Sequence, residues 1–97
     1  MKFFLINTRP LQPLDVVEKN TPAHRAYLRT QYEAGIMLLS GPRVPRTGGV
    51  LIAQADDITA IEKMVAADPF NTTGTMQYEI VEFAPTLWAE QLKPIFE

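Results

Sequence analysis

Short apolar runs alternate with polar stretches along the chain, and each run has the length of one strand or one helix. Apolar and branched runs predict four strands, at residues 2–8, 36–40, 50–53 and 75–83. Amphipathic stretches predict two helices, one at residues 22–34 and one between a capping Asp56 or Asp57 and the Asp68-Pro69 break. The order strand-helix-strand-strand-helix-strand predicts an α+β, ferredoxin-like fold, in which a four-stranded antiparallel sheet carries both helices on one face.

The first helix contains the only histidine of the chain. Thr21 is predicted to cap its N-terminus, Pro22 to be its first residue, and Gly35 to end it. Residues 9–19 are then an irregular connection. His24 would be the third residue of this helix, where the positive end of the helix dipole favours the neutral imidazole that can accept a proton.

The helical wheel places His24 on the inner face of this helix. Tyr27 and Leu28 fall on the same side, whereas Arg25 and Arg29 fall on the outer side. An inward histidine is compatible with a buried ring that only hydrogen-bonds to the protein. A catalytic interpretation therefore requires a partner for the ring.

The predicted sheet has apolar residues on both faces, although two helices cover only one. A second copy of the chain packed sheet to sheet would cover the other face, which predicts a homodimer. The tail at residues 85–97 carries Trp88, Leu92 and Phe96 at four-residue spacing. It is expected to be an amphipathic helix, interrupted by Pro94 and docked on the domain or on the dimer partner.

Length and composition narrow the function classes. The 97 residues suit one domain, with a core at about residues 1–84, and a net charge of -2 gives no reason to expect nucleic acid or an anionic membrane as partner. The chain has no cysteine and one histidine, so no disulfide and no metal site are expected. The chain contains no phosphate-binding loop and no nucleotide-binding fingerprint, so no cofactor is expected. With no signal peptide or transmembrane pattern, a cytoplasmic protein is expected.

Asp68 is the candidate partner of the histidine. It follows Met64 by four residues, so it extends the apolar stripe of the second helix, where a carboxylate needs a hydrogen-bond partner. An aspartate before a proline also commonly caps the turn that follows. Because both helices lie on one face of the predicted sheet, Asp68 could instead reach His24. A carboxylate on one imidazole nitrogen fixes the tautomer and makes the other nitrogen a better base.

Three segments carry a resemblance to a known family: Pro22-Ala23-His24, the stretch from Glu33 to Pro42, and Ala66-Ala67-Asp68-Pro69-Phe70. They make the chain resemble the YCII-related (YciI-like) proteins of the dimeric α+β barrel superfamily. The resemblance implies a ferredoxin-like fold, a sheet-to-sheet dimer, and His24 with Asp68 as the active-site pair. Better understood relatives in the superfamily act on small, often aromatic-derived, lactone or halogenated compounds.

Further residues are expected around this pair. Ser40 and Gly41 end a strand and could offer a hydroxyl and a close backbone N–H, while Tyr27 could form an aromatic wall. Loop arginines could bind a substrate carboxylate through their bidentate guanidinium groups. The loop arginines are Arg9, Arg43 and Arg46.

The sequence therefore predicts a cofactor-independent enzyme for a small organic molecule, with His24 as general base or acid and Asp68 as its orienting partner. Elimination or dehalogenation, isomerisation and hydrolysis each fit this pair, so a lyase, an isomerase and a hydrolase all stay open. The alternative is a non-catalytic, metabolite-binding or accessory dimeric module, in which the two residues form only a structural hydrogen bond.

Overall fold

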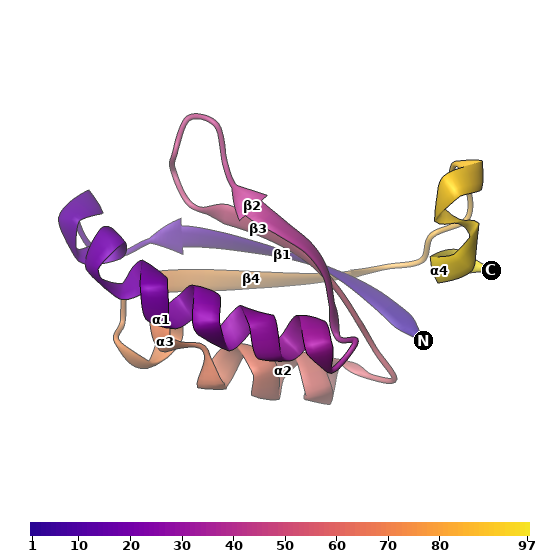
Figure 1. Ribbon diagram of the computed structural model, residues 1–97, viewed down its shortest axis with the longest axis horizontal. Coiled ribbons are helices and arrows are strands. Elements are labelled where there is room, and N and C mark those ends of the chain that lie inside the picture. The colour runs from indigo at the N-terminus through magenta and orange to yellow at the C-terminus, as the bar shows by residue number, and fades with distance from the viewer.

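The computed structural model describes all residues 1–97, and four strands make up a single antiparallel sheet (Figure 1). Its strands lie in the order β2-β3-β1-β4, and every neighbouring pair is antiparallel. The elements in chain order are β1 (Lys2–Pro10), α1 (Leu14–Glu33), β2 (Met37–Pro42), β3 (Gly49–Ala55), α2 (Ile58–Ala67), α3 (Pro69–Thr72), β4 (Met76–Phe83), the 3-10 turn η1 (Glu90–Leu92) and α4 (Lys93–Phe96). This arrangement confirms the predicted ferredoxin-like α+β fold.

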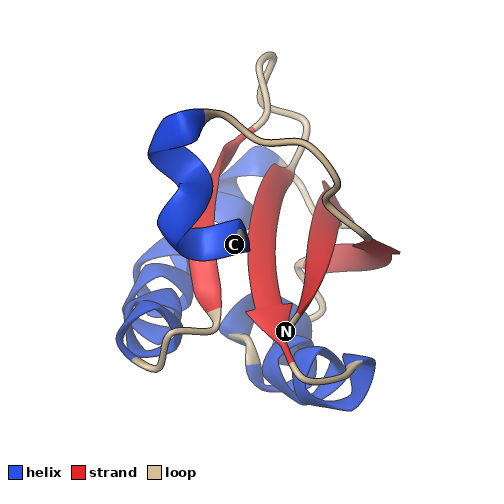
Figure 2. Ribbon diagram, turned by 90° about the vertical axis from the view of Figure 1, so that its right-hand side faces the viewer, coloured by secondary structure: helices blue, strands red, loops and turns tan.

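The helices α1 and α2 pack side by side on one face of the sheet, and the core lies between them and the strands (Figure 2). Alternation along β1 turns Phe4 and Ile6, both fully buried, toward the helices. Ile61 and Met64 of α2 meet them from the other side. These two residues belong to the apolar stripe that the sequence predicts for the second helix, Ile58, Ile61, Met64 and Val65, of which Ile58, at the first turn, is 41% exposed.

Helix α1 begins eight residues before the predicted start. Leu14 opens it after Pro13, and Pro22 lies in its interior. Thr21 does not cap the helix but donates its hydroxyl to the Val17 carbonyl at 2.7 Å. The prediction failed because Pro22 resembles a first-turn proline, whereas here tertiary packing of the preceding turns continues the helix through it. The predicted end is correct, since Gly35 follows the last turn with φ +78°.

The longer helix places His24 ten residues after Leu14, in the middle of α1. The dipole argument for a neutral imidazole is therefore wrong, because the effect is confined to the first turn. The electrostatic setting of His24 comes from the side chains around it.

The hairpin of β2 and β3 is longer than predicted. Gly41 and Pro42, expected to end β2, still pair with Val50 and Gly49 of β3. Gly48 precedes β3 with φ +131°, and a side chain there would collide with the Thr8 carbonyl oxygen. Only glycine lets the chain enter β3 this close to β1, and this fixes the loop of residues 43–48 above one end of the sheet (Figure 1).

The sheet face opposite the helices carries one continuous apolar row. Cross-strand pairing aligns Leu39, Ile52, Leu5 and Val81 across all four strands. Leu39 is 59% and Val81 43% exposed. A row of this kind in a single chain leaves apolar area in contact with water.

The C-terminal segment lies apart from α1 and α2 (Figures 1 and 2). Phe96 packs on Phe3 with ring centroids 4.8 Å apart, and Trp88 stacks on Phe96 at 6.0 Å. The predicted amphipathic helix is reduced to the two short turns η1 and α4. Pro94 lies in the first turn of α4 and does not interrupt it, because the fixed φ of proline suits a helix start. No helix of the chain combines the length and the apolar character needed to span a bilayer.

Candidate active site

His24 and Asp68 are in direct contact between α1 and the start of α3. The imidazole Nδ1 lies 2.8 Å from Oδ1 and 2.9 Å from Oδ2 of Asp68. The histidine side chain is 13% exposed and the carboxylate 3%. The predicted approach of these two side chains across the helix pair is thus present in the fold.

Asp68 also caps the short helix that follows it. Its Oδ1 accepts a hydrogen bond from the Phe70 backbone N–H at 2.9 Å. The two alternatives considered for this aspartate, a turn cap and a histidine partner, therefore hold together. One carboxylate with two oxygens can accept both bonds, and the backbone bond fixes its orientation toward the imidazole.

The ring of Phe70 packs against one face of the imidazole. Its ring is stacked on that of His24, with centroids 3.9 Å apart and planes inclined by 15°. Phe70 is buried and packs with Val17 and Met76. The imidazole is thus held in its plane by the carboxylate and against rotation by the phenyl ring.

The carboxylate also determines which nitrogen carries the proton in the neutral ring. Asp68 accepts from Nδ1–H, so Nε2 keeps its lone pair. Nε2 forms no hydrogen bond within the chain. This is the arrangement of a general base whose accepting atom is free.

A cavity of about 530 Å³ opens beside His24, within the size range of small-molecule sites. Its walls come from α1, the ends of β1 and β4, the β2–β3 hairpin with its loop, and Phe70 of α3. Apolar side chains such as Leu28, Leu51 and Met76 alternate with the hydroxyls of Thr8 and Thr21. The cavity therefore suits a small molecule with an apolar body and a few polar groups.

Three of the six residues expected around the pair line this cavity: Ser40, Gly41 and Arg46. Ser40 and Gly41 lie on its β2 wall. The Ser40 hydroxyl also forms a 2.6 Å hydrogen bond with the Tyr32 hydroxyl. Tyr27 is not among the lining residues, because its hydroxyl turns to the Met64 carbonyl and donates to it at 2.7 Å.

The structure separates the predicted arginines. Arg46 lines the cavity, but Arg9 and Arg43 line a different hollow, which they share with Gln77 and Glu79. The expectation that Arg9 and Arg43 surround the histidine therefore does not hold within one chain. Its physical reason is that β1 continues through Arg9, and strand alternation turns this residue to the opposite face from Thr8.

Leu14, Val17 and Thr21 line the cavity although the sequence prediction did not place them there. Leu14, Val17, Thr21, His24 and Leu28 follow one another at spacings of three and four, and all five line the cavity. This stripe would have revealed the full length of α1 if Pro22 had not been taken as its start. Arg25, predicted to point outward, also lines the cavity.

Two tyrosines next to the pair are held in their neutral form. Burial, and secondly the charge of Asp68, raises the pKa of Tyr27 above its ordinary value. Burial raises the pKa of Tyr78 much further, and the Asp68 carboxylate adds to the effect through its charge and its interaction with the hydroxyl. No donor in the chain reaches the buried Tyr78 hydroxyl, so its ionised form would face the Asp68 carboxylate without compensation.

Replacing Tyr78 with phenylalanine tests this environment. In the wild type, the unfolded chain releases the Tyr78 proton near pH 10 while the folded chain retains it, so stability is lost as the pH rises above 10. We expect Tyr78→Phe to leave the free energy of unfolding equal or slightly higher at pH 8. Above pH 10 its advantage over the wild type should grow by up to about 1.4 kcal/mol per pH unit. Urea denaturation between pH 8 and 11 measures the difference, and parallel pH curves for the two proteins would contradict it.

No group of three or more histidine, aspartate or glutamate side chains converges in the chain. The polar groups at the cavity are instead one imidazole, two guanidinium groups and several hydroxyls. Such a set suits proton transfer and hydrogen bonding to an organic ligand.

Comparisons with known proteins support the fold and show the family. The fold is similar to that of a 5-chloro-2-hydroxyhydroquinone dehydrochlorinase (TftG) from Burkholderia phenoliruptrix AC1100, solved in complex with 2,5-dihydroxybenzoquinone. The TM-score is 0.72 and the sequence identity 26%, over 84% of this chain and 92% of that one. A comparison with curated proteins gave no match. The family model of the YCII-related domain matches residues 1–84, and the chain therefore belongs to the YCII-related family.

Proposed function

We propose that this protein is a cofactor-independent enzyme that eliminates hydrogen chloride, or a similar leaving group with a proton, from a small ring compound. The observation that carries the proposal is the free Nε2 of His24, at a cavity of about 530 Å³, with Nδ1 held by a buried carboxylate. The dehydrochlorinase activity named for the similar structure supports elimination over isomerisation or hydrolysis.

His24 is the general base of the proposed reaction. Its Nε2 accepts a proton from the substrate, the electron pair of the broken bond forms a new double bond in the ring, and chloride leaves with the electrons of the carbon–chlorine bond. The net loss is one proton and one chloride, so no oxidant or reductant is needed. Positioned acid–base groups of this kind accelerate proton transfer by roughly 10²–10⁴-fold.

Asp68 and Phe70 act through the imidazole. The carboxylate stabilises the imidazolium that forms when Nε2 takes the proton, and it keeps the acceptor nitrogen turned to the cavity. Phe70 limits tilting of the ring. Ser40 and Gly41 are proposed to contact the substrate from the β2 wall, where a hydroxyl and a backbone N–H are available.

Chloride release tests the proposal. The purified protein is incubated with a panel of chlorinated hydroquinones and chlorinated ring ketones, and free chloride is measured with a chloride electrode. We expect release from at least one compound with one chloride per turnover. If no compound loses chloride faster than in buffer, the proposed reaction is wrong.

We also propose that the protein is a homodimer that packs sheet to sheet. The row of Leu39, Ile52, Leu5 and Val81 supports this, since no segment of the chain covers Leu39 or Val81. The polar end of the same face, with Arg9 hydrogen-bonded to Gln77, would form the rim.

Light scattering after size-exclusion chromatography tests the dimer. We expect about twice the 10.9 kDa mass of the chain at micromolar concentration. Val81→Glu should shift the mass to that of one chain, because it buries a charge between two apolar rows. Val44→Glu, in the loop after β2 and 97% exposed, is the matched control and should remain dimeric. A monomeric wild type would overturn the proposal.

A further inference from the structure

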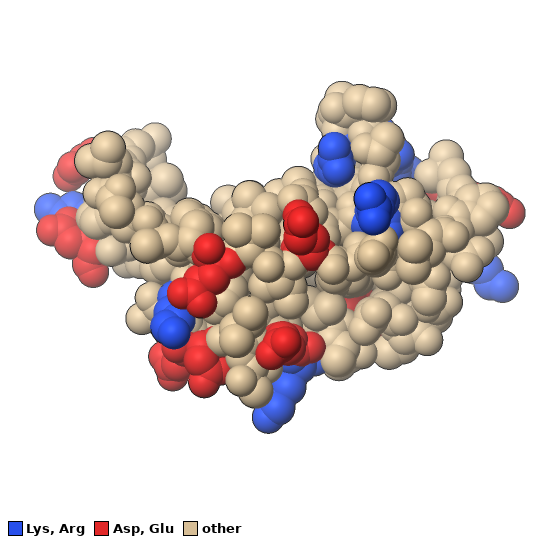
Figure 3. Space-filling model, turned by 180° about the vertical axis from the view of Figure 1, so that it is seen from behind, with Lys and Arg blue, Asp and Glu red and all other residues tan.

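The cavity beside His24 is lined by basic residues without an acidic one. His24, Arg25 and Arg46 are among its walls, and none of the 11 aspartates and glutamates of the chain is. The chain as a whole has a net charge of -2, so this separation of charge is local. Figure 3, which views the molecule from behind, shows basic side chains near the projecting β2–β3 hairpin and a mixture of acidic and basic ones over the rest of that face. The two arginines of this lining are positively charged, and positive charge at a cavity favours an anion.

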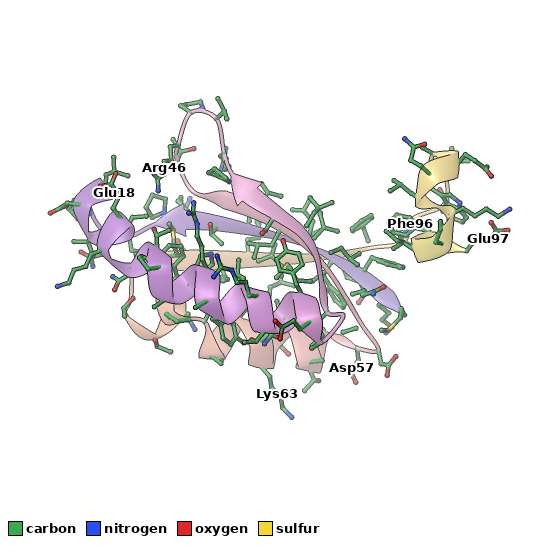
Figure 4. The ribbon with its side chains drawn as sticks, in the orientation of Figure 1. Glu18, Arg46, Asp57, Lys63, Phe96 and Glu97 are labelled. Atoms are coloured by element: carbon green, nitrogen blue, oxygen red, sulfur yellow. The ribbon has the colours of Figure 1, made fainter.

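The two arginines approach the cavity from different elements. Arg25 is the neighbour of His24 on α1, and Arg46 lies on the loop between β2 and β3. Figure 4 shows Arg46 on the side of the loop that faces Glu18 of α1. The cavity is thus lined by two guanidinium groups that come from two separate elements.

Neither guanidinium group is committed to a strong partner within the chain. Arg46 Nη1 is 3.8 Å from Glu18 Oε1, and both side chains are about half exposed, at 49% and 58%. An ion pair this long and this exposed contributes little to stability. Arg25 has neither an ion pair nor a hydrogen bond in the chain. Both groups are free to form bidentate bonds with an incoming anion.

The residues that line the interior of the cavity indicate the chemistry of the rest of the ligand. Val17, Leu28 and Phe70 surround the interior near His24, and water has few partners there apart from the hydroxyls of Thr8 and Thr21. The ligand should therefore have an apolar ring at the histidine and a negative charge toward the arginines. A phenolate or an enolate oxygen on the ring, or a carboxylate attached to it, provides that charge.

We infer that the substrate is an anionic ring compound, whose negative group is bound between Arg25 and Arg46 while its reacting carbon faces His24. This inference rests on the proposed elimination for the role of His24, but the anion specificity follows from the cavity alone. Arg25 and Arg46 are accordingly specificity-determining residues and take no proton.

Binding of a matched pair of probes tests the inference. The anionic probe is 2,5-dihydroxybenzoquinone, whose acidic hydroxyls are ionised at neutral pH, and the neutral probe is its dimethyl ether. Dissociation constants are measured by isothermal titration calorimetry with the full chain. We expect the anion to bind at least tenfold more tightly than the ether, and its affinity to fall as salt is raised.

Substitutions locate the anion site. Arg25→Gln and Arg46→Gln should each weaken binding of the anionic probe by roughly tenfold, the scale of one charge-assisted hydrogen bond at a partly exposed site. Arg46→Lys should recover part of the loss, because it restores charge without the fork. Arg29→Gln is the control, since Arg29 is one turn away on α1 and does not line the cavity. Binding of the ether should not change in any variant.

The outcomes separate this inference from the proposed reaction. Equal affinity for the two probes, no binding of either, or unchanged anion binding in both arginine variants would overturn the inference, whether or not chloride is released. Arginine-dependent anion binding in a protein that never releases chloride would support the inference and refute the elimination. His24→Gln should keep the anion preference, because the imidazole does not contact the negative group in the proposed pose.

Discussion

Replacing His24 with glutamine should lower kcat by roughly 10²–10⁴-fold, the contribution of a positioned proton acceptor. Glutamine has no group that takes a proton near neutral pH, and its amide does not reproduce the imidazole stacked on Phe70. KM should change much less than kcat, because the apolar walls and the arginines still bind the substrate. Steady-state assays of chloride release with the best substrate of the panel measure both constants.

The pH profile gives a second readout for His24. A general base acts only in its unprotonated form, so the rate of the wild type should depend on pH in a way that the residual activity of His24→Gln does not. A variant with kcat within a few fold of the wild type and the same pH profile would exclude the base role. In the alternative of a non-catalytic binding module, the substitution would change only stability, by about 1–3 kcal/mol for one buried hydrogen-bonded partner.

The largest effect expected away from the imidazole is that of Asp68→Asn, which should also lower kcat by roughly 10²–10⁴-fold. The asparagine oxygen can still accept from the Phe70 N–H. Its NH₂ group then faces Nδ1 and donates to it, so the ring proton moves to Nε2. The atom that should accept the substrate proton is then already protonated.

A matched aspartate separates this effect from helix capping. Asp57 accepts from the Ala60 N–H at the start of α2, as Asp68 accepts from that of Phe70, but it does not contact the histidine. Asp57→Asn should therefore keep kcat unchanged, with a small loss of stability at most. NMR of the ring nitrogens should show the proton on Nδ1 in the wild type and on Nε2 in Asp68→Asn. The same tautomer in both proteins would contradict the explanation.

Most of the fold could be predicted from the periodicity of apolar residues and from the residues that cap or end helices. The Asp57 cap, Gly35 and the apolar strands gave the order of elements and the helix-covered face, because each depends on local rules. The predicted start of α1 was eight residues too late. Pro22 has the features of a first helical residue, but packing on the sheet extends the helix to Leu14. The tail was predicted as one amphipathic helix, whereas it holds only two short turns.

The sequence predicted the central pair of the site better than it predicted which other residues lie near that pair. His24 and Asp68 came together because both helices of this topology share a face, so sequence spacing and fold together were sufficient. The positions of Tyr27 and Arg43 depend on the directions their side chains take, which sequence spacing does not determine, and that of Arg9 depends on the continuation of β1 beyond its predicted end at residue 8. Arg25 was assigned outward from the wheel, but an arginine is long enough to reach the mouth of the cavity from the flank of α1.

The acid–base pair and the loop arginine belong to different parts of the chain. Asp68 and Phe70 stand on one tight turn, α3, whereas Arg46 is held by a hairpin loop that contributes nothing to the imidazole's orientation. Exchanging residues 43–47 between Pro42 and Gly48 should therefore alter which molecules bind while the proposed proton-transfer residues His24 and Asp68 keep their contact. Because the two parts are separate, evolution or engineering could change the substrate preference through the loop and leave the His24–Asp68 pair unchanged.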